Sequence, residues 1–256
     1  MEITQLDKSG LKELVMLYRS HRGGVYYTPE NTMPAFSYAL ESGYDYIETD
    51  PQLTLDGVVV LMHDGTINRT CRNSDGSRIE NPVEVAKTTY AELMQYDAGI
   101  AMGEKFRGTK IPRLDELLSA AEGRDVIIAL DKKIPTDKID SLLVVIEKYD
   151  TKVCFSTSDT ARIKKIQERF PDAHFDYDVN LEDESLEEVC CLVKPENLVV
   201  WMYLDKPNFS WLVQKAKVSP ENYARVKKYA RVGIANVNTP IDVKEALDYA
   251  PDVIEI

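Results

Sequence analysis

Short apolar runs alternate along the chain with longer stretches in which apolar residues recur every three or four positions. The short runs have the length of buried strands, and the longer stretches have the period of amphipathic helices. Eight such strands joined by helices predict an α/β fold, a TIM (β/α)8 barrel, because parallel strands need crossover helices. The strands are expected at 14–20, 46–53, 126–131, 152–156, 174–178, 198–204, 231–237 and 252–256.

The first helix shows both of its boundaries in the stretch NTMPAFSYALESG. Asn31 is expected to be the N-cap, Pro34 fits the first turn, and Gly43 ends the helix. The outer ring of the barrel is one helix short unless residues 1–12 complete it, because no helix follows the eighth strand. Further helices are expected at 113–122, 136–149, 159–169, 183–193, 219–230 and 241–250.

One segment interrupts the alternation. Residues 64–111 are rich in turn residues and show little helical period beyond a capping-box pattern from Thr89 to Glu92. A polar excursion of this length in a compact barrel is typical of a lid or binding loop, although a plain surface loop fits the composition equally well. We therefore expect a single barrel domain over residues 1–256, with 64–111 as an inserted, lid-like subdomain.

Composition narrows the choice of partners. The chain has 256 residues, 44% of them hydrophobic, which suits one closed barrel. Its 31 basic and 43 acidic residues give a net charge of −12, which argues against nucleic acid and anionic membranes as partners. The four cysteines have no paired spacing that would indicate zinc.

The start of the chain, MEITQLDKSGLKEL, has no apolar core of a signal peptide, and no run is long enough to cross a bilayer. We therefore expect no stable membrane insertion and, as the sequence stands, a cytoplasmic location. A signal peptide removed before residue 1 would instead make the protein secreted or periplasmic. The sequence does not indicate an oligomeric state.

Two carboxylates lie close together in the second strand region. Glu48 and Asp50 are two positions apart, so in a strand they share one face at a spacing of roughly 6 to 7 Å. Two carboxylates on one side of an apolar strand repel each other unless a cation or a proton intervenes. A metal ion is one resolution, and exposure to solvent beyond the strand end is the other.

Other reactive side chains also follow apolar runs. Asp131 ends the third strand, Lys133 shares its face, and His63 ends the run VVVLMHD. His21 and Arg22 stand in the stretch SHRGG after the first strand, a stretch that a plain polar turn would also explain. Because active sites of barrels lie at the carboxyl ends of the strands, we expect all these groups to converge there.

The three histidines differ in their surroundings. His21 and His63 both follow strands near carboxylates, whereas His174 opens a strand and is interpreted as structural. A pair of imidazoles beside an acidic metal site supplies one group to accept a proton and one to donate it. Arg22 and Lys133 add the positive charge that a phosphate needs inside an acidic protein.

The ordered motifs resemble those of the glycerophosphodiester phosphodiesterase family. In residues 21–76 the elements HRG, PENT, AF, E-x-D, T-x-DG, HD and RT follow one another, and KFRGTKIPRLDELLSAA is similar to a later family segment. The resemblance is strong over the first half of the chain and loose over the rest. Many ordered matches are more specific than any single motif.

This resemblance implies a TIM barrel with a divalent cation that hydrolyses small glycerophosphodiesters to glycerol 3-phosphate and an alcohol. It implies His21 and His63 as the acid and base, and Arg22 as a phosphate contact. It also implies that Glu48 and Asp50 are metal ligands. Residues 64–111 correspond to the family's inserted subdomain.

The chain departs from the family pattern at several places. The family's E-x-K is replaced by Asp131 and Lys133, and its W-T-V-N by residues 235–238, which lack the aromatic residue. A final T-D is absent, because the chain stops at VIEI. We expect Glu48, Asp50 and Asp131 to hold Mg²⁺ or Ca²⁺, since hard cations prefer oxygen ligands.

Two other functions fit the same architecture. A phospholipase C or D-like barrel would act on membrane lipids, but the net negative charge and the lack of an apolar stretch in 64–111 argue against it. A non-catalytic phosphodiester-binding barrel is the second alternative. The two retained histidines argue against it, because binding alone needs no proton pair.

Overall fold

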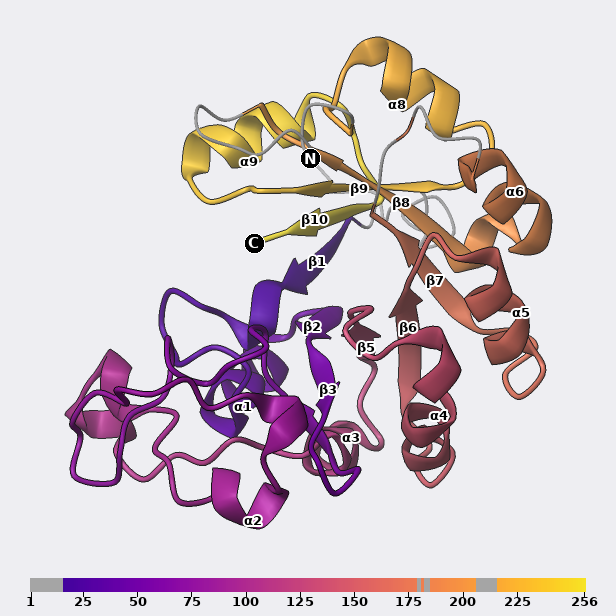
Figure 1. The fold of residues 1–256 in the computed structure, drawn as a ribbon. Coiled ribbons are helices and arrows are strands. Elements are labelled where there is room, and N and C mark those ends of the chain that lie inside the picture. Colours follow the sequence, from indigo (N-terminus) through magenta and orange to yellow (C-terminus); the bar gives the residue numbers. More distant parts are fainter. Residues whose placement is uncertain (1–15, 179–180, 182–184, 206–215) are drawn as a thin grey trace.

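The protein, described here from a computed structural model that covers residues 16–178, 181, 185–205 and 216–256, contains a closed barrel of eight parallel strands (Figure 1). The barrel confirms the fold class expected from the sequence. Its strand order is β1-β10-β9-β8-β7-β6-β5-β2, so β1 and β7 lie on opposite walls. The strands are β1 (Leu17–Ser20), β2 (Tyr46–Thr49), β5 (Ile127–Leu130), β6 (Lys152–Ser156), β7 (His174–Tyr177), β8 (Leu198–Tyr203), β9 (Arg231–Ala235) and β10 (Val253–Glu255).

The strand expected over 46–53 is two strands instead of one, so this boundary was wrong. The chain leaves the barrel at Asp50, whose peptide N–H donates to the side-chain Oδ1 of Asn31 at 3.2 Å. Pro51, which follows, has no N–H to continue the ladder. β3 (Pro51–Leu53) then pairs antiparallel with β4 (Val59–Leu61) in a separate two-stranded sheet.

Helices follow most of the barrel strands. The first one has Thr32 as its N-cap, so the expectation of Asn31 at this position was wrong by one residue. The segment 1–12 that was expected to complete the ring lies outside the described residues. The helices are α1 (Met33–Ser42), α3 (Leu114–Ala121), α4 (Asp140–Ile146), α5 (Thr160–Gln167), α6 (Ser185–Leu192), α8 (Pro220–Val226) and α9 (Pro240–Leu247), with short 3₁₀ turns η2 (His21–Gly23), η6 (Thr136–Lys138) and η7 (Pro195–Asn197).

The segment 64–111 forms short elements with an apolar cluster of its own. Its capping box at Thr89 and Glu92 is confirmed. In Figure 1 the segment lies beside α1, far from α8. Its elements are η3 (Val85–Lys87), α2 (Tyr90–Leu93), η4 (Ile100–Met102) and η5 (Glu104–Phe106), and its buried cluster contains Val60, Met62, Ile67, Cys71, Val85, Leu93, Ala98 and Ile111.

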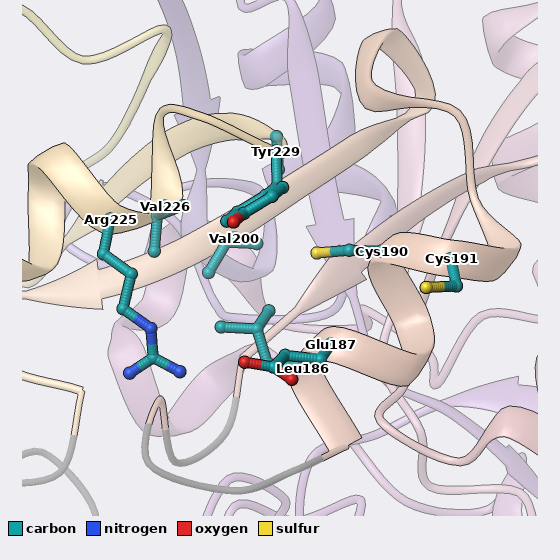
Figure 2. Close-up of a pocket in the computed structure, with 9 residues that line it drawn as sticks. Leu186, Glu187, Cys190, Cys191, Val200, Arg225, Val226 and Tyr229 are labelled. Carbon is teal, nitrogen blue, oxygen red and sulfur yellow. The ribbon is translucent and has the colours of Figure 1, made fainter.

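The helix layer leaves a pocket between α6 and α8, on the outer side of β8 (Figure 2). The pocket has a volume of about 310 Å³, and its lining combines apolar side chains such as Leu186, Val200 and Val226 with the charged Glu187 and Arg225. None of the residues proposed from the sequence for catalysis lines it. In the described parts of the chain, no helix combines the length and the apolar character that a bilayer span requires.

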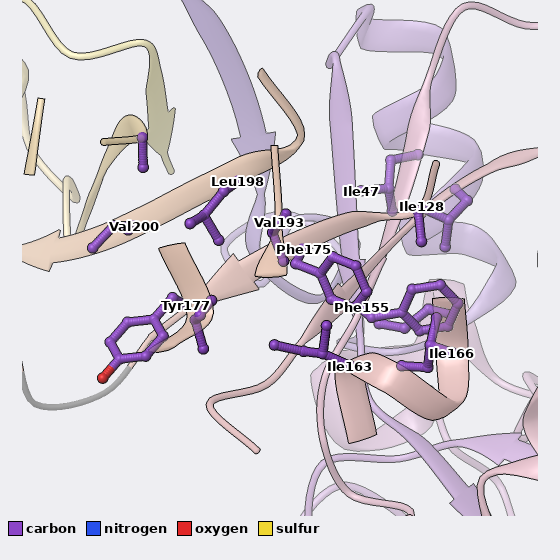
Figure 3. Packing of buried hydrophobic residues seen from close by; sticks show 14 of the residues in the cluster. Ile47, Ile128, Phe155, Ile163, Ile166, Phe175, Tyr177, Val193, Leu198 and Val200 are labelled. Carbon is purple, nitrogen blue, oxygen red and sulfur yellow. The ribbon is translucent and has the colours of Figure 1, made fainter. Parts of the chain in front are cut away.

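The main hydrophobic core lies between the strands and the helices (Figure 3). Phe155 of β6 and Phe175 of β7 pack with their ring centroids 6.1 Å apart, next to Ile163 and Ile166 of α5. These four side chains are almost fully buried. Burying such large apolar groups stabilises each helix against the sheet, and the barrel holds its strand ends in fixed positions as a result.

Candidate active site

The carboxyl ends of neighbouring strands bring the expected side chains to one face of the barrel. His21 begins the turn that follows β1, Glu48 lies in β2, and Asp50 follows directly. Asp131 follows β5, where its peptide N–H donates to the carbonyl oxygen of Thr49 at 3.0 Å. This face is where barrel enzymes carry their chemistry.

The SHRGG stretch forms a tight turn that brings the chain against α1. Arg22 and Gly23 both have left-handed backbone angles, with φ values of 49° and 82°. A Cβ atom on Gly23 would lie only 2.8 Å from the Cβ of Ala35, so a side chain here would push α1 away. Glycine is therefore required for both its conformation and its size.

Glu48 and Asp50 are buried at the strand end, with exposed fractions of 5% and 1%. The alternative of exposure to solvent was therefore wrong. Oε2 of Glu48 accepts the peptide N–H of Arg22 at 2.8 Å, and Oδ2 of Asp50 accepts the side-chain N–H of Asn31 at 2.8 Å. Burial, and next to it the charge of Asp50, raises the pKa of Glu48 well above its ordinary value.

Two cations partly balance these acids. Lys133 Nζ lies 3.1 Å from Oδ2 of Asp131 and 3.5 Å from Oδ1 of Asp50; the expected strand face is not formed, because β5 ends at Leu130 and Lys133 lies in a turn. Arg22 Nε lies 3.6 Å from Oδ2 of Asp50, and Arg22 Nη1 donates to Glu30 at 3.0 Å. Arg22 Nε is buried and has no hydrogen-bond partner among the described residues.

The second histidine reaches the same network from the small sheet. His63 follows β4, and its Nδ1 lies 2.6 Å from Oδ1 of Asp64. Arg69 Nε donates to Oδ2 of Asp64 at 2.6 Å, and Arg69 Nη2 donates to Oε1 of Glu30 at 2.7 Å. Since Glu30 also binds Arg22, a continuous series of polar contacts joins His63 to Asp131.

His21 has a different environment from His63. Burial lowers the pKa of His21, while the nearby carboxylate of Glu255 acts in the opposite direction. Its peptide N–H donates to the carbonyl oxygen of Ile256 at 3.1 Å, which fixes the residue to the end of β10. His174 stands at the start of β7, the opposite end of the strands from His21.

Glu48, Asp50 and Asp131 have the chemistry of ligands for a hard cation. Their side chains are not spaced to share one ion in this structure. Glu48, Asp50 and Asp131 offer only carboxylate oxygens, the donors that Mg²⁺ and Ca²⁺ prefer. Within the described residues, no three His, Cys, Asp or Glu side chains are spaced to share a metal ion. The ammonium group of Lys133 lies against Asp50 and Asp131.

Four residues of the network were not singled out from the sequence as site residues. Glu30, Asn31, Asp64 and Arg69 contact His63, Arg22 and Asp50 or link them to one another. Each of them stands inside a motif that the sequence displays, namely PENT, HD or RT. The motifs could be recognised in the sequence, but which of their residues contact one another depends on the fold.

A closed (β/α)8-type barrel with polar, charged side chains at the carboxyl ends of its strands defines the class of barrel proteins that carry their active sites on this face. The model of the glycerophosphoryl diester phosphodiesterase family matches residues 21–169. The chain belongs to this family.

Similar proteins extend the comparison. The chain is 41% identical over 123 residues to the glycerophosphodiester phosphodiesterase of Caldanaerobacter subterraneus subsp. tengcongensis, covering 48% of this chain and 46% of that protein. It is 32% identical over 126 residues to glycerophosphodiester phosphodiesterase 1 of Mus musculus, covering 48% and 36% of the two chains. The matches thus span just under half of the first relative and about a third of the second.

Solved structures with the same fold cover more of the chain. A Silicibacter pomeroyi protein assigned to the same enzyme class superposes with a TM-score of 0.78 at 23% identity, covering 94% of this chain and 89% of that one. A phosphodiesterase from Oleispira antarctica, in complex with its product sn-glycerol-3-phosphate, gives a TM-score of 0.75 at 19% identity, covering 96% and 94%. At these identities the likeness establishes the fold.

Proposed function

We propose that this protein hydrolyses small glycerophosphodiesters to glycerol 3-phosphate and an alcohol. The observation that carries the proposal is the continuous polar network from His63 to Asp131, which holds every residue type the reaction needs at the carboxyl-end face. Family membership and the product named for the Oleispira antarctica structure support the choice of substrate.

Arg22 and Lys133 are the proposed contacts of the phosphodiester. Both project cationic groups beside Asp50. The buried Arg22 Nε has no hydrogen-bond partner among the described residues, so it can donate to a phosphate oxygen without breaking a bond. This local positive charge offsets the net negative charge of the chain at the site.

His21 and His63 are the proposed proton carriers. Because burial lowers the pKa of His21, this imidazole is neutral near pH 7 and suited to accept a proton from the attacking hydroxyl. His63 is left to return a proton to the departing alcohol. The contact of its Nδ1 with Asp64 fixes the ring and leaves Nε2 free to face the substrate.

Glu48, Asp50 and Asp131 are the proposed ligands of a divalent cation, Mg²⁺ or Ca²⁺. Such an ion would neutralise charge on the phosphodiester. Burial, and then the charge of Asp50, raises the pKa of Glu48, so a cation bound beside Glu48 would favour its charged form. Lys133 would have to release Asp50 and Asp131 for all three acids to bind the ion.

The segment 64–111 is proposed to act as a lid-like subdomain of the single barrel domain. It has its own buried cluster, and it contributes Asp64 and Arg69 to the polar network. Arg69 also holds Glu30 of the loop after β1, so the segment is tied to the site by ion pairs.

A product assay tests the proposal. Purified protein is incubated with glycerophosphocholine, glycerophosphoethanolamine, a lysophospholipid and bis(p-nitrophenyl) phosphate, each with Mg²⁺ or Ca²⁺. Release of glycerol 3-phosphate from the first two substrates is the expected result. Release of a phosphorylated headgroup, cleavage of the lysophospholipid alone, or binding without turnover would contradict it.

A further inference from the structure

An arginine spans the interior of the barrel directly beneath the candidate site. Arg19 lies on β1 and is 8% exposed. Its Nε donates to Oε2 of Glu255 on β10, and its Nη1 donates to Oδ2 of Asp176 on β7, both at 2.6 Å. The guanidinium also lies over the ring of Trp201 on β8, 4.1 Å from the ring centroid.

These contacts connect opposite walls of the barrel. Arg19 and Glu255 are direct neighbours in the register of the β1–β10 pair. Asp176 stands on β7, which is four strands away from β1 in the closed order of eight. One side chain therefore joins β1 and β10 to the wall on the far side of the barrel.

Fold stability alone does not explain such a network. Burial lowers the pKa of Arg19, but Glu255 and Asp176 raise it above its ordinary value, while burial raises the pKa of Asp176. Removing charges from water is costly, and buried ion pairs can often be replaced by apolar groups with no loss of stability. Their better-attested use is to fix one arrangement of the structure.

The arrangement that Arg19 fixes includes His21. His21 is the first residue of η2, directly after the end of β1 at Ser20, and so stands two positions on from Arg19. His21 is attached to the same strand pair, because its peptide N–H donates to the carbonyl oxygen of Ile256, the residue after Glu255. The fork of a guanidinium presents different nitrogens to Glu255 and Asp176, whereas a lysine offers a single ammonium nitrogen.

We propose that Arg19 is a positioning residue, which braces β1 and β10 against β7 through Glu255 and Asp176 and so fixes the place of His21. This role rests on the proposed function, since His21 is taken as a proton carrier. Arg19 lies below the site and does not touch the substrate. Its loss therefore lowers the rate of the chemical step and leaves substrate binding nearly unchanged.

The test removes the whole network in one step. The variant R19M/D176N/E255Q keeps side chains of similar size and leaves no buried charge unpaired, so it is expected to fold. Its kcat for glycerophosphocholine is expected to fall on the order of 10- to 100-fold, with KM within about threefold, because misplacing a reacting group has effects of this size. Wild-type kcat in the folded variant, or a rise in KM alone, would overturn the proposal.

A second variant separates bracing from charge. R19K keeps the positive charge but replaces the guanidinium fork with a single ammonium nitrogen, which does not reproduce the two separate contacts of Arg19 with Glu255 and Asp176, so it is expected to show a reduced kcat as well. Wild-type kcat in R19K would show that charge alone suffices and would contradict the brace. As a control, R169M removes the exposed pair between Arg169 and Glu147 and is expected to leave kcat and KM unchanged.

A third measurement does not depend on activity. Amide hydrogen exchange over residues 17–24 is expected to be faster in R19M/D176N/E255Q than in the wild type, whereas exchange in α4 and α5 stays the same. Unchanged exchange over residues 17–24 would overturn the brace. If the wild type releases no glycerol 3-phosphate, the proposed function fails, and this measurement still decides the role of Arg19 in positioning β1.

Discussion

The peptide N–H of Arg22 donates a 2.8 Å hydrogen bond to Oε2 of Glu48, which ties the turn after β1 to the end of β2. This bond needs only an acceptor at position 48, whereas a divalent cation needs the charge. E48Q is therefore expected to fold normally and to bind Ca²⁺ or Mg²⁺ about 10- to 100-fold more weakly. Calorimetric titration measures the affinity, and E80Q, at an exposed position, is the control. Equal affinity in E48Q and the wild type would remove Glu48 from the ligand set.

Removal of the metal is expected to stop catalysis. After dialysis against EDTA, hydrolysis of glycerophosphocholine should be lost, and added Mg²⁺ or Ca²⁺ should restore it. The physical reason is that the proposed ion would neutralise charge on the phosphodiester beyond what Arg22 and Lys133 supply. Full activity in metal-free buffer would contradict this prediction and would show that Arg22 and Lys133 neutralise the phosphodiester without a metal ion.

Gly23 is expected to tolerate no side chain. G23A combines a left-handed φ of 82° with a contact of 2.8 Å to Ala35, and should cost about 2 to 5 kcal/mol of unfolding free energy. Gly57 has a similar φ of 79° with no atom within 4 Å of a Cβ, so G57A should cost about 1 to 2 kcal/mol. Urea denaturation measures both. Equal losses of unfolding free energy in G23A and G57A would show that the contact of residue 23 with Ala35 of α1 does not contribute.

Acid should weaken the contact between Arg69 and Asp64. The hydrogen bond from Arg69 lowers the pKa of Asp64 to about 2, below its ordinary value of 3.8. A carboxylate with a lowered pKa stabilises the fold above the ordinary value, and this contribution is lost as the pH falls from about 4 towards 2. The pair is partly exposed, so the effect is at most about 1 kcal/mol.

Denaturation of the wild type and of D64N at several pH values measures this contribution. The difference in unfolding free energy between the two proteins should be constant above about pH 4 and should shrink at lower pH. A difference that does not change between pH 5 and pH 2 would contradict the assignment.

The barrel and most of its strands could be predicted from the sequence, because buried parallel strands are continuous apolar runs. The end of the barrel strand before Asp50 could not be predicted in this way. It depends on Asn31, which comes from a different part of the chain and accepts the peptide N–H that a barrel strand would otherwise use. Thr32, and not Asn31, is the N-cap of α1.

The site could be predicted as a set of residue types but not as a set of partners. Positions at or just after strand ends led to the prediction of His21, Glu48, Asp131 and Lys133, because carboxyl strand ends converge in a barrel. The contacts of Arg69 with Glu30 and Asp64 join segments whose spacing only the fold determines. Arg19 was read as part of an apolar run, and its partners lie on β7 and β10.

The central claim is that His21 and His63 both carry protons in the reaction, and their substitution tests it most directly. The measurement is the kcat for release of glycerol 3-phosphate from glycerophosphocholine by the wild type, H21A and H63A, with H174A as the control. Loss of a proton carrier should lower kcat by about 10²- to 10⁴-fold in H21A and in H63A, whereas H174A should match the wild type. Near wild-type turnover in either H21A or H63A would contradict the two-histidine site.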